Sequence, residues 1–187
     1  MHTTYIKDET FEKSDLIQRG EYENCIFKNC DFTSADFTGF RFEDCTFSEC
    51  NLSMVKLDHV ILQDVKFKDC KMLGLRFDTC SKIGLSFSFD GCKLDHSSFY
   101  KAKITKTTFK NSVLEGTDFV EADLTGSLFD NCDLNHAMFE QTKLEKVDFR
   151  TSYNYSIDPE NNKIKKAKFS ISNIHGLLDR YDILIEK

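Results

Sequence analysis

The eight cysteines are the residues whose type most suggests chemistry in this 187-residue sequence, because thiols bind metal ions and form disulfides. No two of them form a C-x-x-C pair, the spacing typical of zinc and redox sites. The sequence also lacks G-x-S-x-G, H-E-x-x-H and any glycine-rich phosphate loop. We therefore expect no enzyme activity, no catalytic residue, no cofactor and no bound metal.

A unit of five residues repeats from Ser112 to Phe149. The third residue of each unit is Leu or Phe and the first is small or β-branched, as in Ala122-Asp123-Leu124. Thirteen consecutive third positions from Phe89 to Phe149 are apolar in a chain that is 40% hydrophobic, which chance would give about once in a hundred thousand trials. A second phase, offset by two residues, runs from Tyr22 to Phe77.

A period of five residues fits neither the 3.6-residue turn of an α-helix nor the two-residue alternation of a strand. A longer period must therefore set how many pentads make one turn of the chain. From Leu94 onward the third positions alternate Leu or Ile with Phe, and one set of Phe recurs every twenty residues with a single step of twenty-two. That set is Phe27, Phe47, Phe67, Phe89, Phe109, Phe129, Phe149 and Phe169. The pattern predicts a coil of four pentads in which Phe side chains stack on two opposite sides, with mostly Leu or Ile on the other two.

The cysteines occupy the small, inward-facing position of this repeat, two residues before each centre. They are Cys25, Cys30, Cys45, Cys50, Cys70, Cys92 and Cys132, and Cys80 continues the same phase. Successive coils would place some of them about 4.8 Å apart, close enough for a bridge. Parallel side chains in a filled interior favour reduced thiols instead. His96 and His136 take equivalent outward positions two coils apart, about 10 Å, and so cannot share a metal.

The repeat resembles the pentapeptide-repeat family, whose motif is A-(D/N)-L-x-x. The matching stretches include Ala35-Asp36-Phe37, Ala122-Asp123-Leu124 and Cys132-Asp133-Leu134, and the resemblance covers about residues 22–169. It implies an all-β solenoid, a right-handed quadrilateral β-helix, with a short C-terminal α-helical cap. We expect an N-terminal cap at 1–19, the β-helix at 20–169 with a phase break at 78–88 and a loop at 151–162, and a C-terminal cap at 170–187.

Acidic residues along the rod are the candidate binding surface. The net charge of −6 argues against direct binding of nucleic acid through its phosphates. Placing pentads on sides groups four acids on one side and two round the next corner: Glu23, Glu43, Asp44 and Asp64, then Glu49 and Asp69. These residues are either a solvated face or a strip that binds a partner.

The resemblance to Qnr- and MfpA-type members implies a rod that mimics DNA, binds DNA gyrase or topoisomerase IV, and affects quinolone susceptibility. The sequence lacks the long projecting loops of Qnr-type proteins, so a generic structural or protein-interaction rod with another partner is the alternative. The resemblance also implies a homodimer formed through the C-terminal cap. Its candidate contacts are Ile174, Leu177, Leu178, Tyr181, Ile183 and Ile185.

No apolar run approaches a signal peptide or a membrane-spanning helix. We therefore expect a cytoplasmic protein that does not bind membranes.

Overall fold

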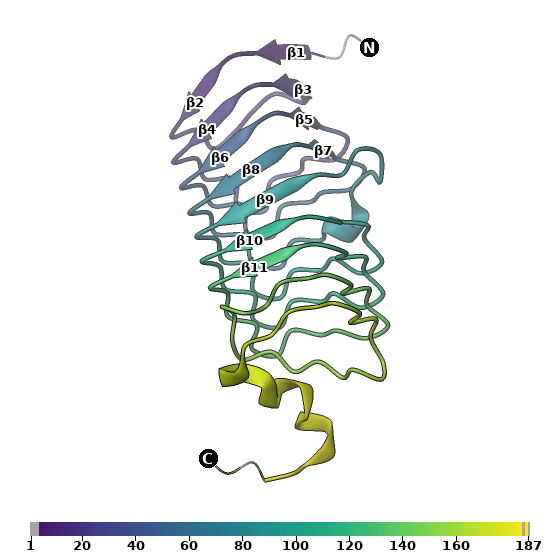
Figure 1. The fold of residues 1–187 in the computed structure, drawn as a ribbon. Coiled ribbons are helices and arrows are strands. Elements are labelled where there is room, and N and C mark those ends of the chain that lie inside the picture. Colours follow the sequence, from purple (N-terminus) through teal and green to yellow (C-terminus); the bar gives the residue numbers. More distant parts are fainter. Residues whose placement is uncertain (1–3, 185, 187) are drawn as a thin grey trace.

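The computed structural model describes residues 4–184 and 186, and its chain winds into a stack of coils (Figure 1). Two parallel sheets run along the stack. One contains β1 (Thr4–Lys7), β3 (Gly20–Glu23), β5 (Arg41–Glu43) and β7 (Ile61–Gln63). The other contains β2 (Thr10–Glu12), β4 (Ile26–Lys28), β6 (Thr46–Ser48), β8 (Val65–Lys68), β9 (Phe87–Asp90), β10 (Thr108–Lys110) and β11 (Leu128–Asp130).

The pairing register confirms the predicted coil. Phe27 pairs with Phe47, and Phe109 pairs with Phe129, so equivalent residues lie twenty apart. Isolated parallel bridges such as Val113 to Asp133 extend the same register to the remaining sides. The protein is a right-handed quadrilateral β-helix built from pentads.

Stacked aromatic rings fill the interior, as predicted. Phe129 lies 4.7 Å from Phe109 and 4.9 Å from Phe149 between ring centroids, with nearly parallel planes. A second column forms on the opposite side, where Phe119 stacks at 5.2 Å on both Phe99 and Phe139. Rings of the two columns meet edge to face, an arrangement that the quadrupole of the ring favours.

The small inward position of the pentad donates hydrogen bonds between coils. Cys50 Sγ lies 3.3 Å from the carbonyl oxygen of Phe27, and Ser152 Oγ lies 2.8 Å from that of Phe129. All eight cysteines are buried and free, in the position that the phase predicts. Cys, Ser or Thr at this position can therefore add a hydrogen bond between coils, which Ala or Val at the equivalent position in other pentads does not provide.

The predicted phase break is a local insertion in one coil. Val65 pairs with Phe87, so the step rises to twenty-two while the Phe column continues through Phe67 and Phe89 at 5.3 Å. A single 3-10 turn, η1 (Phe77–Thr79), and a loop over residues 80–86 take up the extra length. No strand forms there on the side that carries β7 in the preceding coil.

The N-terminal segment adds strands to both sheets. Residues Thr4–Lys7 pair with Gly20–Glu23, and Phe11 stacks on Phe27 at 5.0 Å. The register here is sixteen residues instead of twenty, which is why no clean pentad phase is visible in this part of the sequence.

The C-terminal cap is helical but differs in type from the α-helix that we expected. It consists of two 3-10 helices, η2 (Ile171–Leu177) and η3 (Asp179–Tyr181), closed by bonds between residues three apart. Gly176 lies so close to Tyr155 that an added Cβ would approach the Tyr155 carbonyl oxygen to 2.0 Å. Within the described part of the chain, no helix has the length and apolar character needed to cross a membrane.

Candidate partner-binding surfaces

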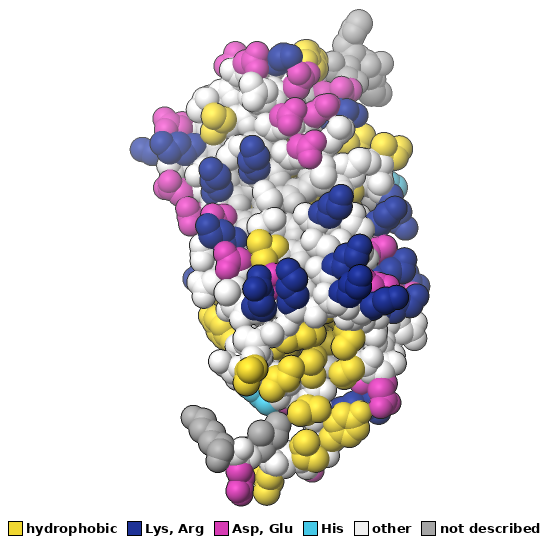
Figure 2. Space-filling view, viewed as in Figure 1, with side chains coloured by type: hydrophobic (Ala, Val, Ile, Leu, Met, Phe, Trp, Pro, Cys, Tyr) yellow, Lys and Arg dark blue, Asp and Glu magenta, His cyan; other side chains and the backbone are white. Residues whose placement is uncertain are grey.

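Two outer sides of the rod carry the predicted acidic residues. We call face 1 the side formed by β1, β3, β5 and β7 and continued below the insertion by bridged residues from Lys103 to Lys163. Face 2 is the side formed by β2, β4, β6 and β8 to β11. In Figure 2 acidic side chains gather in the upper part of the molecule and basic ones at mid-height, mainly on the right.

Glu23 and Glu43 lie side by side on face 1, paired across β3 and β5. Each has a basic neighbour: Lys7 Nζ is 2.6 Å from Glu23 and Arg41 Nη2 is 2.7 Å from Glu43. The hydrogen bond from Lys7 lowers the pKa of Glu23, which also accepts a bond from the Tyr5 hydroxyl. Their charge is therefore partly neutralised, which the sequence alone did not indicate.

Asp44 and Asp64 lie at the corner between faces 1 and 2, in successive coils. Both have a left-handed backbone, with φ of 53° and 52°, and both are exposed. Asp64 accepts a 3.1 Å hydrogen bond from Ser86. Among the described residues, Asp44 forms no ion pair.

Glu49 and Asp69 lie at the far corner of face 2, where they too are exposed with positive φ. Face 2 separates them from Asp44 and Asp64, and it carries Lys66 in the same coil as Asp64 and Asp69. The structure therefore does not bring the six acids into one continuous strip. Glu23 and Glu43 lie on face 1, and the other four form two corner ridges that flank face 2, Asp44 with Asp64 and Glu49 with Asp69.

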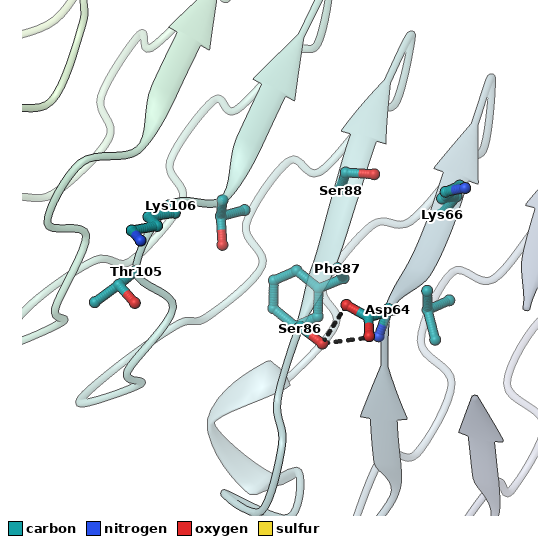
Figure 3. Close-up of a pocket in the computed structure, with 9 residues that line it drawn as sticks. Asp64, Lys66, Ser86, Phe87, Ser88, Thr105 and Lys106 are labelled. Carbon is teal, nitrogen blue, oxygen red and sulfur yellow. Dashed lines mark hydrogen bonds between the residues drawn. The ribbon is translucent and has the colours of Figure 1, made fainter. Parts of the chain in front are cut away.

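A hollow of about 320 Å³ opens at the insertion, where a coil lacks its strand on face 1 (Figure 3). Asp64 and Ser86 line one part of it, joined by their hydrogen bond, while Lys66 and Lys106 lie at its sides. Hydroxyl groups of Thr105 and neighbouring residues complete the lining. Its lining residues are therefore mainly polar, with one carboxylate and two lysines.

The predicted dimer residues divide into two groups. Leu177 packs against the core and Leu178 is half-buried, so both hold the cap on the last coil. Ile174, Tyr181 and Ile183 expose 41%, 48% and 54% of their surface, and their apolar atoms have no cover in the described chain. Ile185 lies outside the described residues.

Polar contacts tie the cap to the loop before it. Arg180 Nη1 is 2.5 Å from Asp158, and the Tyr181 hydroxyl donates a 2.9 Å bond to Glu160. The hydrogen bond from Arg180 lowers the pKa of Asp158. The exposed apolar groups are therefore held in place by charged neighbours.

The titratable groups show no catalytic arrangement among the described residues. Burial raises the pKa of Cys45 to about 12 and that of Tyr22 to about 12, so both are neutral and poor nucleophiles at neutral pH. In the same part of the chain, no three His, Cys, Asp or Glu side chains group closely enough to hold a metal ion.

A column of basic residues on face 1 is a feature that the predicted binding sites do not include. Lys103 and Lys143 lie in one bridged column with Lys163, separated by Asp123. Their spacing of twenty and forty residues is the signal that could have revealed them, because residues twenty apart lie one above the other in this fold.

Comparison with known proteins agrees with the geometry. Residues 20–88 and 85–155 match the sequence profile described as pentapeptide repeat region. No curated protein matches the chain as a sequence relative.

Solved structures share the fold at low sequence identity. A trypsin-treated form of QnrB1, described as a plasmid-mediated fluoroquinolone resistance protein, superposes with a TM-score of 0.66 at 18% identity, covering 100% of both chains. Full-length QnrB1 gives 0.65 at 18%, covering 96% of this chain and 100% of its own. HetL of Nostoc sp. strain PCC 7120, described as involved in heterocyst differentiation regulation, gives 0.52 at 14%, covering 88% and 84%.

Proposed function

Because the chain belongs to the pentapeptide-repeat family, we propose that it is a non-enzymatic binding protein whose acidic upper half engages a type II topoisomerase, DNA gyrase or topoisomerase IV, as a mimic of DNA. The observation that carries the proposal is the pair of acidic ridges flanking face 2 on a rod of stacked coils. A topoisomerase holds duplex DNA in a basic groove, and a rod with this charge presents a similar field to that groove.

The ridges resemble DNA in the overall electrostatic field that they produce. The spacing of their carboxylates does not match the spacing of DNA phosphates. Asp44 and Asp64 are one coil apart, about 4.8 Å, whereas phosphates along one strand of B-DNA are separated by more than that. Both aspartates project from corners of the coil, where a partner reaches them without displacing a strand. The fold likeness to QnrB1, whose description names fluoroquinolone resistance, supports a test of drug protection in the same assay.

A second candidate is a generic protein-interaction rod with a different partner. The ion pairs of Glu23 with Lys7 and of Glu43 with Arg41 favour it, because they reduce the charge that a DNA mimic would present. An acidic surface that keeps exposed strands soluble would look the same.

We also propose that the protein is a homodimer joined at the C-terminal cap. Ile174, Tyr181 and Ile183 form an apolar surface that one coil end does not cover. A two-fold contact between identical caps would bury it in an isologous interface.

The test is DNA supercoiling by gyrase from the source organism, titrated with this protein with and without a quinolone. We expect inhibition or drug protection that weakens as salt is added, because the contact is electrostatic. Replacing Asp44 and Asp69 with Lys should remove the effect, and folding should persist because Lys106 and Lys146 already occupy such corners with φ of 59° and 60°.

The matched control replaces Asp58 and Glu140, two exposed acids on another side of the rod, with Lys. It changes the net charge equally but leaves both ridges intact. If neither inhibition nor protection appears at tens of micromolar, the topoisomerase proposal fails and the generic rod replaces it. An equal loss of effect in both variants would show that net charge, and not the ridges, is responsible.

A further inference from the structure

Lysines on the lower half of face 1 form a second charged surface, opposite in sign to the first. We call it the basic patch. It consists of Lys103, Lys106, Lys143, Lys146, Lys163, Lys165 and Lys166, all exposed. Figure 2 shows basic side chains crowded in this part of the molecule, below the acidic upper half.

The patch is ordered by the coil. Lys106, Lys146 and Lys166 share one corner column with Gly126, and all four have positive φ. Backbone bonds confirm the register, since Lys106 N donates to Thr125 and Lys146 N to Lys165. The column from Lys106 to Lys166 spans three coil spacings, about 14 Å.

Acidic residues do not neutralise the patch. Within the described chain, only Lys143 of the seven lysines has a carboxylate within ion-pair distance, 3.2 Å from Asp123. Asp123 itself is recessed, with 19% of its side chain exposed, and it also accepts a bond from the Thr125 hydroxyl. The other acid, Glu145, is half-buried, and one of its carboxylate oxygens lies buried without a hydrogen-bond partner. The lysine ammonium groups are therefore more exposed to solvent than the two carboxylates.

We propose that the basic patch binds an acidic segment of a protein in extended conformation. About 14 Å corresponds to four or five extended residues, so a short run of Asp or Glu matches the lysine column in length. The hollow beside Lys106, with Lys66 at its other side, gives room for one further side chain of that segment.

The surroundings of the patch disfavour nucleic acid. Asp64 and Asp44 continue the same corner upward, so a duplex long enough to gain several phosphate contacts would overrun onto acid. The patch itself contains lysine and no aromatic residue, whereas single-stranded nucleic acid is usually held by stacking on aromatic rings. A short acidic peptide would fit on the patch without reaching Asp64 and Asp44, and it needs no aromatic ring for stacking.

The experiment measures fluorescence anisotropy of a labelled octa-glutamate peptide titrated with the full chain at about 50 mM and about 300 mM salt. We expect saturable binding at low salt that weakens at least about tenfold at high salt. The variant with Lys106, Lys146 and Lys166 changed to Glu should bind at least about tenfold more weakly, because like charges then face the peptide.

The matched control changes Lys56, Lys71 and Lys93, exposed lysines on the other two sides, to Glu. It should bind within about twofold of the wild type, and thermal unfolding should show that both triple variants fold. Absence of peptide binding at low salt overturns the proposal, as does an equal loss in the control. Tighter binding of a 20-nucleotide single strand or duplex, or of vesicles containing anionic lipid, also overturns it in favour of that ligand.

Discussion

Thr142 Oγ1 donates a 2.9 Å hydrogen bond to the carbonyl oxygen of Phe119, which lies in the preceding coil. Thr142 is fully buried, and so is Phe119. The same bond recurs at other small inward positions, as between Thr117 and the carbonyl oxygen of Leu94 at 3.1 Å. Coils are thus joined inside the rod by side chains as well as by the strand ladder.

Changing Thr142 to Val should destabilise the protein by about 1 kcal/mol, because it removes this bond without changing the side-chain volume greatly. The cost stays small because the Phe119 carbonyl still accepts a bond from Ala122 N at 3.0 Å. Urea unfolding measures it. Thr105→Val, at an exposed position, is the control and should change stability by less than about 0.5 kcal/mol.

Changing Phe119 to Ala should cost about 3–5 kcal/mol, because it leaves a cavity in a closely packed column. The ring has no exposed surface and stacks on both neighbours. Met138→Ala, at a position with 47% exposure, is the control and should change stability by less than about 0.5 kcal/mol. A loss below about 1 kcal/mol for Phe119→Ala would contradict its role in the core.

The thiols should react with a thiol reagent only after unfolding. Burial raises the pKa of Cys45 to about 12 and that of Cys132 to about 11. Denatured protein without reductant should consume eight equivalents, because all eight cysteines are free. Two equivalents fewer would reveal a disulfide.

The same shifts predict a loss of stability in alkali. An unfolded thiol titrates at about pH 8.5, so the folded protein binds more protons than the unfolded chain above that pH. This contribution to stability is intact below about pH 8.5 and is lost as the pH rises through the folded values of about 11 and 12. Urea midpoints across this range measure it, and the Cys45→Ser, Cys132→Ser variant should show a shallower fall.

Changing Gly176 to Ala should displace the cap, because the new Cβ would collide with the carbonyl oxygen of Tyr155. The bond from Ile157 N to the Gly176 carbonyl, 2.8 Å long, would be strained as well. Hydrogen exchange should show faster exchange at Ile157 with little change at Phe109. Ser172→Ala, at an exposed position of η2, is the control. Unchanged protection at Ile157 would count against the contact.

Changing Ile174 and Ile183 to Glu should give a monomer of nearly unchanged thermal stability, because both side chains are largely exposed in the single chain. Sedimentation at micromolar concentration measures the oligomeric state. Ile83→Glu alters an apolar residue with 77% exposure in the mid-chain loop and should leave a dimer intact. A wild type that sediments as a monomer would refute the proposed dimer.

The solenoid and its interior could be predicted from the sequence because the residue pattern within each pentad indicates which side chains point inward. The phase that places Phe109 inward also places Phe129 inward, and the small position before each centre marks the cysteines as buried. Packing repeats with the coil, so local periodicity and tertiary structure carry the same information. The insertion could be predicted for the same reason, because the spacing between Phe67 and Phe89 is twenty-two residues instead of twenty.

The charged surfaces depend on which side chains contact each other across coils. The five-residue periodicity specifies only some of these contacts. Glu23 was visible as an acid, but its partner Lys7 lies in a segment without pentad phase, so the ion pair emerges only when β1 pairs with β3. The lysines of the basic patch come from pentads twenty to sixty residues apart, and the left-handed corners decide that they project together.

The type of helix in the C-terminal cap could not be predicted from the sequence. The family resemblance implied a helical cap at 170–187, yet the 3-10 form depends on tertiary contact. Gly176 must lie against the backbone of Tyr155, and Arg180 must reach Asp158. The sequence by itself therefore determined the rod and its interior, where one rule repeats in every coil. Only the tertiary structure decided the ends and the charged faces, where residues meet once and no repeat specifies the contact.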